Sequence, residues 1–434
     1  MLLKEKGIVA LYALQWLVYH IGIIISAPIV VGNALGLNPA EIGKLSQLTF
    51  FLTGIASLIQ IRFGHGGLLI EGPAAPWWAA CVILAGIAKE MGRPLASVRT
   101  DIEGAMIVAG LTLAVLGWIG LIKWARSLFT NRVTGILLML LGLQIGGVGI
   151  KGLAGGGLKL LIIGLLVLLM VIYLTLHGRG LLKNSAIILS VAFGWLLSFL
   201  AGEVILPGGT TWFSLPPLFP WGPPSFEIGS VVSFLLLGLL LIPNVVGSIA
   251  ALEAATGERL PLKKYDRGLA VSGTANFLAG VFGGIGTIPF AISAGLISFS
   301  GNKSPKPFIL SCVIFIAMGL FPPLGALAGS VPQPVAAAIL LVSGCSLAMI
   351  GLQDMGREEI TLRENFIIGL SLLSGIGVML LPPSQWEQIP GWAAGVLSNG
   401  VIVGVLGSIL LEHVVLRKPR QSVSQSVTGK VGHN

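Results

Sequence analysis

Charged residues are scarce in this sequence. Of its 434 residues, 10% are Asp, Glu, Lys or Arg and 55% are hydrophobic, whereas soluble domains carry roughly 25% charged residues. The mean hydropathy is +0.95. The composition therefore excludes a water-soluble globular protein and indicates a protein that lies in a lipid bilayer.

Cysteines and catalytic motifs are scarce as well. The three cysteines, Cys81, Cys312 and Cys345, all lie in apolar runs, which argues against a disulfide framework and favours small packing residues. The sequence contains no HExxH, GxSxG or P-loop pattern and no cysteine–histidine pair, so an intramembrane enzyme is a weak alternative. No pattern indicates a metal site or a cofactor.

Long apolar runs make up most of the chain. A spanning helix needs about 20 apolar residues, and the charge-free runs are long enough for an all-α polytopic protein with fourteen crossings. The first run follows Lys4 and Lys6 and is too long for the apolar core of a signal peptide, so we expect a retained first span. The crossings are expected at 8–33, 41–61, 67–88, 104–122, 128–149, 159–177, 184–202, 228–252, 267–283, 285–301, 306–328, 332–351, 362–381 and 394–416.

The basic residues predict the orientation, because cytoplasmic loops of membrane proteins are rich in Lys and Arg. We therefore expect both termini in the cytoplasm and the protein in the cytoplasmic (inner) membrane. The net charge of +9 follows from the same bias and needs no nucleic-acid partner. The longest outer loop, 203–227, carries no basic residue. With the N-terminus inside, only six of the 26 Lys and Arg residues lie outside: Lys44, Lys89, Arg93, Arg99, Lys151 and Lys159.

Two of the expected spans are too rich in glycine and proline to be ordinary helices. They contain "GGLLIEGPAAPWW" (66–78) and "GGIGTIPFAISAGLISFSG" (283–301), and each occupies the third place in its half of the chain. Because seven is an odd number of spans, the second half of the chain would cross the membrane in the orientation opposite to the first. Paired interrupted segments in corresponding places of two such halves indicate the binding site of a secondary transporter. We expect a short extended segment near 67–71 and another near 286–290. Each precedes a half helix, and the two face each other near the midplane.

Several stretches resemble one transporter family. "LTFFLTGIASLIQIRFGHGGLLIEGPA", "PNVVGSIAALEAATG", "RGLAVSGTANFLAGVFGG" and "AGLISFSG" follow in the order and spacing of the nucleobase:cation symporter-2 (xanthine/uracil permease, nucleobase-ascorbate transporter) family. The resemblance implies short β-strands in spans 3 and 10 and, for many members, a homodimer. It also implies a core domain (1–122 and 228–330), a gate domain (123–227 and 331–416) and a cytoplasmic tail (417–434).

The family resemblance implies a nucleobase substrate, a purine such as xanthine, hypoxanthine, guanine or urate. In proton-coupled members, acidic or amide residues in spans 8 and 10 hold the base. Here the span 8 position is Asn244, a histidine that some members carry one turn later is Ser248, and the span 10 pair is Ile292 and Ser293. Asn244 offers one donor and one acceptor, so we expect neutral oxo-purines with adjacent N–H and C=O groups to be preferred over anions.

Backbone amides are the second kind of substrate contact that the resemblance implies. A broken span exposes N–H groups without using a side chain, and the family comparison maps them to Ala74 and Ala75 in span 3 and to Ala291 in span 10. Outside this set, we expect Asn276 to tie the broken backbone to its neighbours and His20 to be a hydrogen-bonded packing residue. Glu253 is expected to be structural, near the cytoplasmic end of its helix.

Glu71 is the candidate for proton coupling, because it stands directly before Gly72-Pro73 inside a membrane span. An ionisable residue there costs about 2.5–3.5 kcal/mol on insertion scales and normally marks function. Two interpretations remain open: Glu71 lines the cavity and replaces the family's missing proton acceptors, or it caps the half helix that follows.

Two other transport functions remain open on this sequence. An inorganic or carboxylate anion transporter with the same inverted-repeat fold is favoured by the missing carboxylates and by half-helix N-termini, although Glu71 argues against it. A facilitative nucleobase uniporter needs no coupling residue. The leading hypothesis is a secondary nucleobase transporter with protons as the coupling partner.

Overall fold

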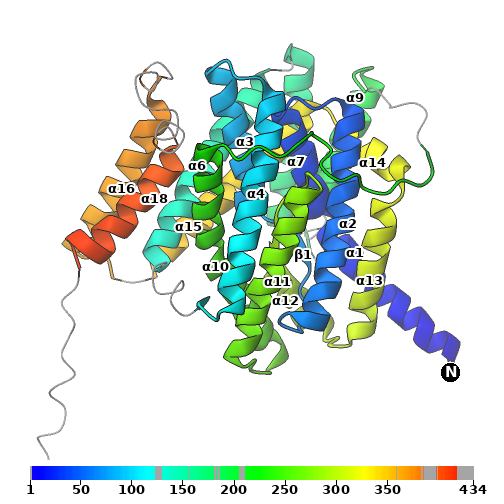
Figure 1. The fold of residues 1–434 in the computed structure, drawn as a ribbon. Helices are drawn as coiled ribbons and strands as arrows, with labels where there is room; N and C mark the ends of the chain where they lie inside the picture. The colour runs from blue at the N-terminus through cyan, green and yellow to red at the C-terminus, as the bar shows by residue number, and fades with distance from the viewer. Residues whose placement is uncertain are drawn as a thin grey trace, which may run out of the picture.

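The chain is described by a computed structural model that is mostly helical (Figure 1). It describes residues 2–122, 130–155, 157–179, 182, 186–204, 211–357, 359–382, 385, 397 and 399–417. The predicted tail, 417–434, lies outside this part of the chain except for Arg417. The elements are α1 (Leu2–Ala34), α2 (Pro39–Phe63), β1 (Glu71–Pro73), α3 (Ala75–Glu90), α4 (Leu95–Trp118), α6 (Asn131–Ala154), α7 (Gly157–His177), α9 (Ala186–Leu200), α10 (Ile228–Thr256), α11 (Leu262–Val281), β2 (Thr287–Pro289), α12 (Ile292–Ser300), α13 (Pro305–Gly319), α14 (Pro322–Gly329), α15 (Gln333–Met355), α16 (Leu362–Leu380), α18 (Gly400–Leu410) and the π-helix η2 (Leu411–Val415).

Helix boundaries follow signals that are local in the sequence. α2 begins with a capping box, in which the Asn38 side chain accepts from Glu41 N and the Glu41 side chain accepts from Asn38 N. These two bonds satisfy N–H groups that a helix start leaves open. α10 begins after Glu227, whose carboxylate accepts two backbone N–H groups, and ends at Gly257 with φ 76°. Glycine adopts this left-handed conformation without a Cβ clash.

The number of long apolar helices is smaller than the number of predicted crossings. Among the described residues, eight helices are long and apolar enough to cross a membrane: α1, α2, α4, α6, α7, α10, α15 and α16. The span expected at 306–328 is not one straight helix, because α13 and α14 meet at an angle of 80°; if this bent pair is one span, the number of candidate spans is nine among the described residues. Pro322 and Pro323 follow the break, and proline cannot continue a helix from its preceding turn. The predicted spans 7 and 14 contain the shorter apolar helices Leu189–Leu200 and Gly400–Val415.

The two predicted extended segments form one small antiparallel sheet. Glu71 pairs with Pro289, Gly72 with Ile288 and Pro73 with Thr287. β2 lies within the expected range 286–290, whereas β1 begins at the last residue of the expected range 67–71. Each strand is three residues long and ends at a proline, which has no N–H to extend a strand ladder.

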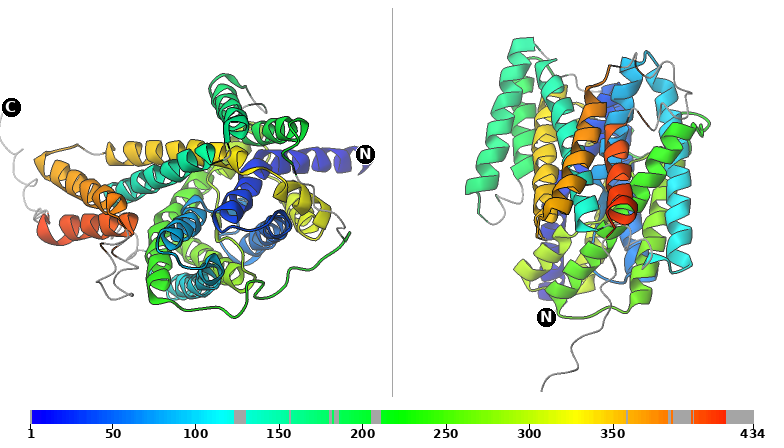
Figure 2. Two further views of the ribbon diagram at one scale, coloured as in Figure 1. Left: turned by 90° about the horizontal axis from the view of Figure 1, so that it is seen from above. Right: turned by 90° about the vertical axis from the view of Figure 1, so that its left-hand side faces the viewer.

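The helices form two groups (Figures 1 and 2). The strand-bearing group contains α1 to α4, α10 to α14 and the two strands; in it α2 packs on α13 and α14, and α4 packs on α10 and α11. The second group, named the α6–α15 group, contains α6, α7, α9, α15, α16, α18 and η2. α1 contacts α9 and α15, and α3 contacts α6, so these helices form the junction between the groups.

Glycines allow close helix packing inside each group. In α6, a Cβ atom at Gly142 would lie 2.5 Å from the Gly344 carbonyl oxygen of α15. In α4, a Cβ atom at Gly110 would lie 2.2 Å from the Phe277 nitrogen of α11. Small residues at such contacts let helix backbones approach each other, which replaces the missing hydrophobic driving force between helices in lipid.

A buried cluster of ion pairs joins three helices of the α6–α15 group. Arg132 at the start of α6 lies 3.5 Å from a carboxylate oxygen of Glu364 in α16 and 3.0 Å from one of Glu412 in η2. Arg363 pairs with Glu364 at 2.9 Å, and the Thr130 hydroxyl donates to Glu412 at 2.7 Å. From the sequence, Arg132 and Arg363 are interpreted as part of the positive charge of cytoplasmic loops. In the structure they pair with the buried carboxylates of Glu364 and Glu412.

Candidate functional site

The strands bring two helix N-termini together at the centre of the strand-bearing group. α3 begins soon after β1 and α12 soon after β2, and the antiparallel pairing makes the two helices leave the sheet in opposite directions. A helix N-terminus presents backbone N–H groups and a partial positive charge. We call β1, β2 and the first turns of α3 and α12 the strand crossing. It suits carbonyl oxygens or negatively charged groups of a ligand.

The backbone amides expected at the substrate differ in their availability. Ala74 is fully buried, and its N–H donates to the Gly286 carbonyl oxygen at 3.0 Å. Ala75 opens α3, and its side chain lies outside the described part of the chain. Ala291 and Ile292 are exposed at the start of α12, with Ile292 at 37% of full exposure. The accessible helix N-terminus is therefore that of α12.

α10 passes the strand crossing with Asn244 and Ser248 on one face, because residues four apart are neighbours on a helix. Ser248 is buried, and its hydroxyl donates to the Pro289 carbonyl oxygen at 2.7 Å. Asn244 is half-buried, and its side chain has no hydrogen-bond partner among the described residues. Gly247, next on this face, is exposed and has no heavy atom within 4 Å of its Cβ position. Ser248 thus holds the strand, and the Asn244 amide is available to a ligand.

His20 and Ser293 connect α1 to the strand crossing. His20 Nδ1 lies 2.9 Å from the Trp16 carbonyl oxygen, and Nε2 lies 2.9 Å from Ser293 Oγ. The Ile70 N–H donates to the same Ser293 oxygen at 3.1 Å. A neutral imidazole that donates from Nδ1 leaves Nε2 to accept the Ser293 proton. His20 is fully buried, so the prediction of a hydrogen-bonded packing residue is confirmed.

Glu71 faces the space between α2 and α11. Gln60 Nε2 donates to Glu71 Oε1 at 2.5 Å, and Ser272 Oγ donates to the same oxygen at 2.7 Å. The Glu71 N–H donates to Ser57 Oγ at 2.8 Å. Glu71 is fully buried, and all these partners are uncharged. The N-cap of α3 is Ala74, without a side-chain cap bond, so Glu71 makes no capping hydrogen bond to this half helix.

Asn276 fastens β2 to α11, as the sequence predicts. Its Oδ1 accepts from Thr287 N at 2.7 Å, and its Nδ2 donates to the Thr287 carbonyl oxygen at 3.0 Å. The same Nδ2 donates to the Ser272 carbonyl oxygen at 2.9 Å. One amide therefore satisfies both backbone groups of a strand residue that would otherwise be buried without partners.

Three buried oxygens near Glu71 lack hydrogen-bond partners among the described residues: Glu71 Oε2, Thr287 Oγ1 and Thr53 Oγ1. Glu71 and Thr287 lie on the same face of the sheet, because their registers differ by two residues. Thr53 precedes Ser57 by one turn on α2 and accepts the Ser57 proton through its carbonyl oxygen. Buried polar atoms are rarely left unpaired, and a threonine hydroxyl can donate to a carboxylate oxygen or accept from a protonated carboxyl, so this cluster can accommodate either form of Glu71.

A cavity of about 760 Å³ lies at the junction of the two helix groups. It is lined by α1, α3, α6, α15 and α16, and it includes the polar side chains of Asn33, Gln144 and Gln333. Gln144 Oε1 is buried without a hydrogen-bond partner among the described residues. Along α3 the cavity reaches from Glu90 to Val82, and Val82 lies seven positions after Ala75 in the sequence. At 1.5 Å per residue the cavity therefore ends about 10 Å short of the strand crossing.

Sequence reasoning missed the partners of Glu71. Gln60 and Ser57 lie in α2 and Ser272 lies in α11, and polar residues of membrane helices commonly make helix–helix contacts. The available signal was the spacing of Thr53, Ser57 and Gln60, which places them on one face of a helix. That pattern predicts a polar face but does not identify what it meets.

Comparisons with known proteins agree on a transporter. The sequence matches the family model of the xanthine/uracil permeases, described as "Permease family", over residues 7–384. YwdJ of Bacillus subtilis (strain 168), which is named as a purine permease, is 30% identical over 94% of this chain and 96% of its own length. The uric acid permease PucK of Bacillus subtilis (strain 168) is 28% identical over 89% of this chain and 90% of its own.

A solved structure shows the same fold at low sequence identity. The transmembrane domain of the cyanobacterial bicarbonate transporter BicA has a TM-score of 0.63 and 15% identity, covering 92% of this chain and 96% of that chain. At this identity the likeness concerns the fold alone. The overall arrangement of the helices is therefore shared with that structure.

Proposed function

Because the chain belongs to the xanthine/uracil permease family, we propose that it is a secondary active transporter of a purine nucleobase. As a permease it is an integral multi-pass membrane transporter and not an enzyme. The single observation that carries the substrate proposal is the Asn244 amide, which faces the strand crossing region without a partner among the described residues. The names of the relatives, a purine permease and a uric acid permease, support the same class.

The proposed substrate site lies between α10 and the N-terminus of α12. Asn244 offers a donor and an acceptor to the edge of a purine, and the first-turn N–H groups at Ala291 and Ile292 meet a ring carbonyl. Ser248 and Ser293 act one step away by holding Pro289 and Ile70 in place. Ala74 and Ala75 form the opposite end of the site, where the Ala74 N–H already bonds to Gly286.

The proposed architecture has fourteen spans in two inverted sets of seven. The antiparallel strands and the reciprocal packing of α2 on α13 and α14 and of α4 on α11 support it. In this arrangement the strand-bearing group is the core domain and the α6–α15 group is the gate domain. The end of the molecule with segment 211–227 is then outside, both termini are in the cytoplasm, and two copies associate in the inner membrane as a homodimer.

Glu71 is proposed to take up and release the coupling proton. The Asn244 and Ile292 positions carry no carboxylate, so the site needs another titratable group if transport is driven by protons. Glu71 sits in β1, is held by uncharged donors and has one carboxylate oxygen without a partner among the described residues. Glu71 is fully buried, and the ionised form of a buried carboxylate is costly without a counter-charge. Its protonation should therefore change when the site opens to water on either side of the membrane.

A radiotracer uptake panel tests the proposed function. In vesicles that contain the protein, we expect uptake of one or more of xanthine, hypoxanthine, guanine and uric acid, with competition among these purines. Pyrimidines should compete weakly, and sulfate and bicarbonate should not compete. Uptake of sulfate or bicarbonate that purines do not displace would instead support the anion transporter.

Asn244→Leu is expected to raise the KM for the purine by about tenfold or more, because the buried ring edge then loses both hydrogen bonds of the amide. The measurement is initial uptake rate against substrate concentration, corrected for the amount of protein in the membrane. Gln353→Leu is the matched control, because Gln353 is an exposed amide on α15. An unchanged KM for Asn244→Leu would remove this residue from the site.

A further inference from the structure

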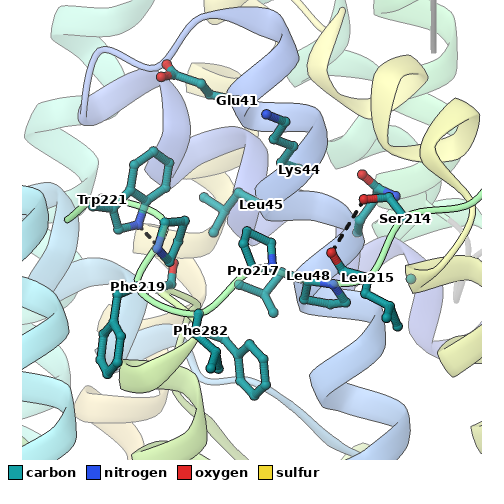
Figure 3. A pocket seen from close by; sticks show the side chains of 16 residues that line it. Glu41, Lys44, Leu45, Leu48, Ser214, Leu215, Pro217, Phe219, Trp221 and Phe282 are labelled. Atoms are coloured by element: carbon teal, nitrogen blue, oxygen red, sulfur yellow. Dashed lines mark hydrogen bonds between the residues drawn. The ribbon is translucent and has the colours of Figure 1, made fainter. Parts of the chain in front are cut away.

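A second cavity lies apart from the proposed transport site. It has a volume of about 500 Å³ and is enclosed by the first half of α2, segment 214–221, and the residues that follow α11 (Figure 3). It shares no lining residue with the cavity at the junction of the two helix groups. Its size lies within the range of about 300–1,000 Å³ that is typical of small-molecule sites. We call it the loop cavity.

The wall of the loop cavity is fixed in place by hydrogen bonds. Ser214 N donates to the Leu320 carbonyl oxygen at 3.2 Å, and Phe219 N donates to the Val281 carbonyl oxygen at 2.9 Å. Trp221 Nε1 donates to the Gly283 carbonyl oxygen at 3.2 Å. The segment is thus attached to the strand-bearing group at three points, and the cavity is formed before any ligand arrives.

Gln47 is the observation that points to a ligand. It lines the cavity and is 8% exposed, and its side chain has no hydrogen-bond partner among the described residues. Its stem packs against α14, where a Cβ atom at Gly325 would lie 2.6 Å from Gln47 Cγ. The amide therefore cannot easily turn away. The amide stays at the cavity, where a ligand that bonds to it would supply the partner that the described residues do not.

Lys44 supplies the charge of the loop cavity. It lies three residues before Gln47 on the same face of α2, it is exposed, and it has no ion pair among the described residues. The nearby carboxylate of Glu41 is engaged, because it accepts from Asn38 N at 2.9 Å and lies 4.0 Å from Arg99. The charge that remains for a ligand is positive.

Aromatic rings form the apolar surface of the loop cavity. Phe219, Trp221 and Phe282 line it together with prolines of the segment (Figure 3). The Arg99 guanidinium lies 5.5 Å from the centre of the Trp221 ring and fixes its orientation. Rigid aromatic walls stack well on a flat ring.

We propose that the loop cavity binds a planar heteroaromatic anion with ring carbonyls, the chemical class of urate. Lys44 pairs with the negative charge, the Gln47 amide bonds to a ring N–H or carbonyl, and the aromatic residues stack on the ring. The site is additional to the proposed transport site and goes beyond the proposed function.

Protection of a cysteine in the cavity tests this proposal. The background protein carries Cys345→Ala, which removes the exposed native cysteine. In this background Ser214→Cys is labelled with a maleimide in lipid nanodiscs, which leave both faces of the membrane accessible. We expect urate to slow the labelling several-fold in a saturable way. Ala96→Cys, at an exposed position in α4, is the control whose labelling urate should not change. Equal labelling of Ser214→Cys with and without urate would overturn the proposal.

Three further variants separate this site from the transport site. Gln47→Leu and Lys44→Gln should each raise the urate concentration that gives half-protection by about five- to tenfold, in line with one lost hydrogen bond or ion contact. Lys44 is exposed, so Lys44→Gln remains informative if Gln47→Leu reduces the yield of folded protein. In Asn244→Leu, protection of Ser214→Cys should persist. Loss of protection there would overturn the proposal, because urate would then act through the transport site.

Discussion

Glu71→Gln is expected to abolish accumulation of the purine against its concentration gradient. The glutamine carbonyl can still accept from Gln60 Nε2 and Ser272 Oγ, which both donate to one oxygen of Glu71, so the fold is preserved. The amide cannot gain or lose a proton. One proton moving down a gradient of one pH unit can drive at most about tenfold accumulation of a neutral substrate, and in the variant this ratio should fall to about one.

The measurement is steady-state uptake in vesicles with an imposed pH gradient, together with substrate exchange without a gradient. Exchange should continue in Glu71→Gln, because it needs substrate binding and not proton release. Glu253→Gln is the matched control: Glu253 lies near the end of α10 and accepts from Leu260 N at 2.6 Å, far from β1 in the chain. If Glu71→Gln still accumulates substrate with an unchanged pH dependence, then Glu71 is structural and the coupling proposal is wrong.

The second large effect is expected at Arg132. Arg132→Leu leaves the buried carboxylate of Glu412 with the Thr130 hydroxyl, at 2.7 Å, as its one side-chain partner among the described residues. Removing one partner of a buried ion pair typically costs about 3–5 kcal/mol, so we expect a large loss of thermal stability. The stability is measured as the unfolding temperature of purified protein in lipid nanodiscs.

A double variant isolates the cause of this loss. Arg132→Leu with Glu412→Leu should recover much of the stability, because the uncompensated carboxylate is removed and Glu364 keeps its contact with Arg363 at 2.9 Å. Lys151→Met is the control for an exposed pair: its ammonium lies 3.4 Å from Glu90, with side-chain exposures of 80% and 54%. Such pairs contribute about 0–1 kcal/mol. Equal losses for Arg132→Leu and Lys151→Met would contradict the role of the cluster.

The sequence predicted much of the strand crossing because its signals are local. Glycine and proline mark both broken spans, and each strand ends at a proline, Pro73 or Pro289. β1 begins later than the predicted range 67–71 suggests. Several residues of the glycine-rich stretch could be extended, and only those that pair with β2 form a strand. The bend between α13 and α14 was missed although Pro322 marks it, because hydropathy alone continues across the break.

The substrate and coupling residues were harder to derive. Asn244 was identified from the order of motifs, and its side chain is available to a ligand in the structure. For Glu71, by contrast, the sequence left open a cap and a cavity-lining proton acceptor, and it did not identify the residues that contact the carboxylate. One of these, Ser272, lies 201 residues away in the chain, and no local pattern reports a contact over that separation.

By itself the sequence determined the solvent, the helical class and the two interrupted spans, because these depend on composition and on the backbone limits of single residues. Only the tertiary structure decided which atoms meet: the register of Glu71 with Pro289, the bonds of Gln60 and Ser272 to one carboxylate oxygen, and the compensation of two glutamates by Arg132. The physical reason is that these contacts join helices distant in sequence. Their pairing depends on how whole helices pack through glycine contacts, and that packing is a property of the assembled fold.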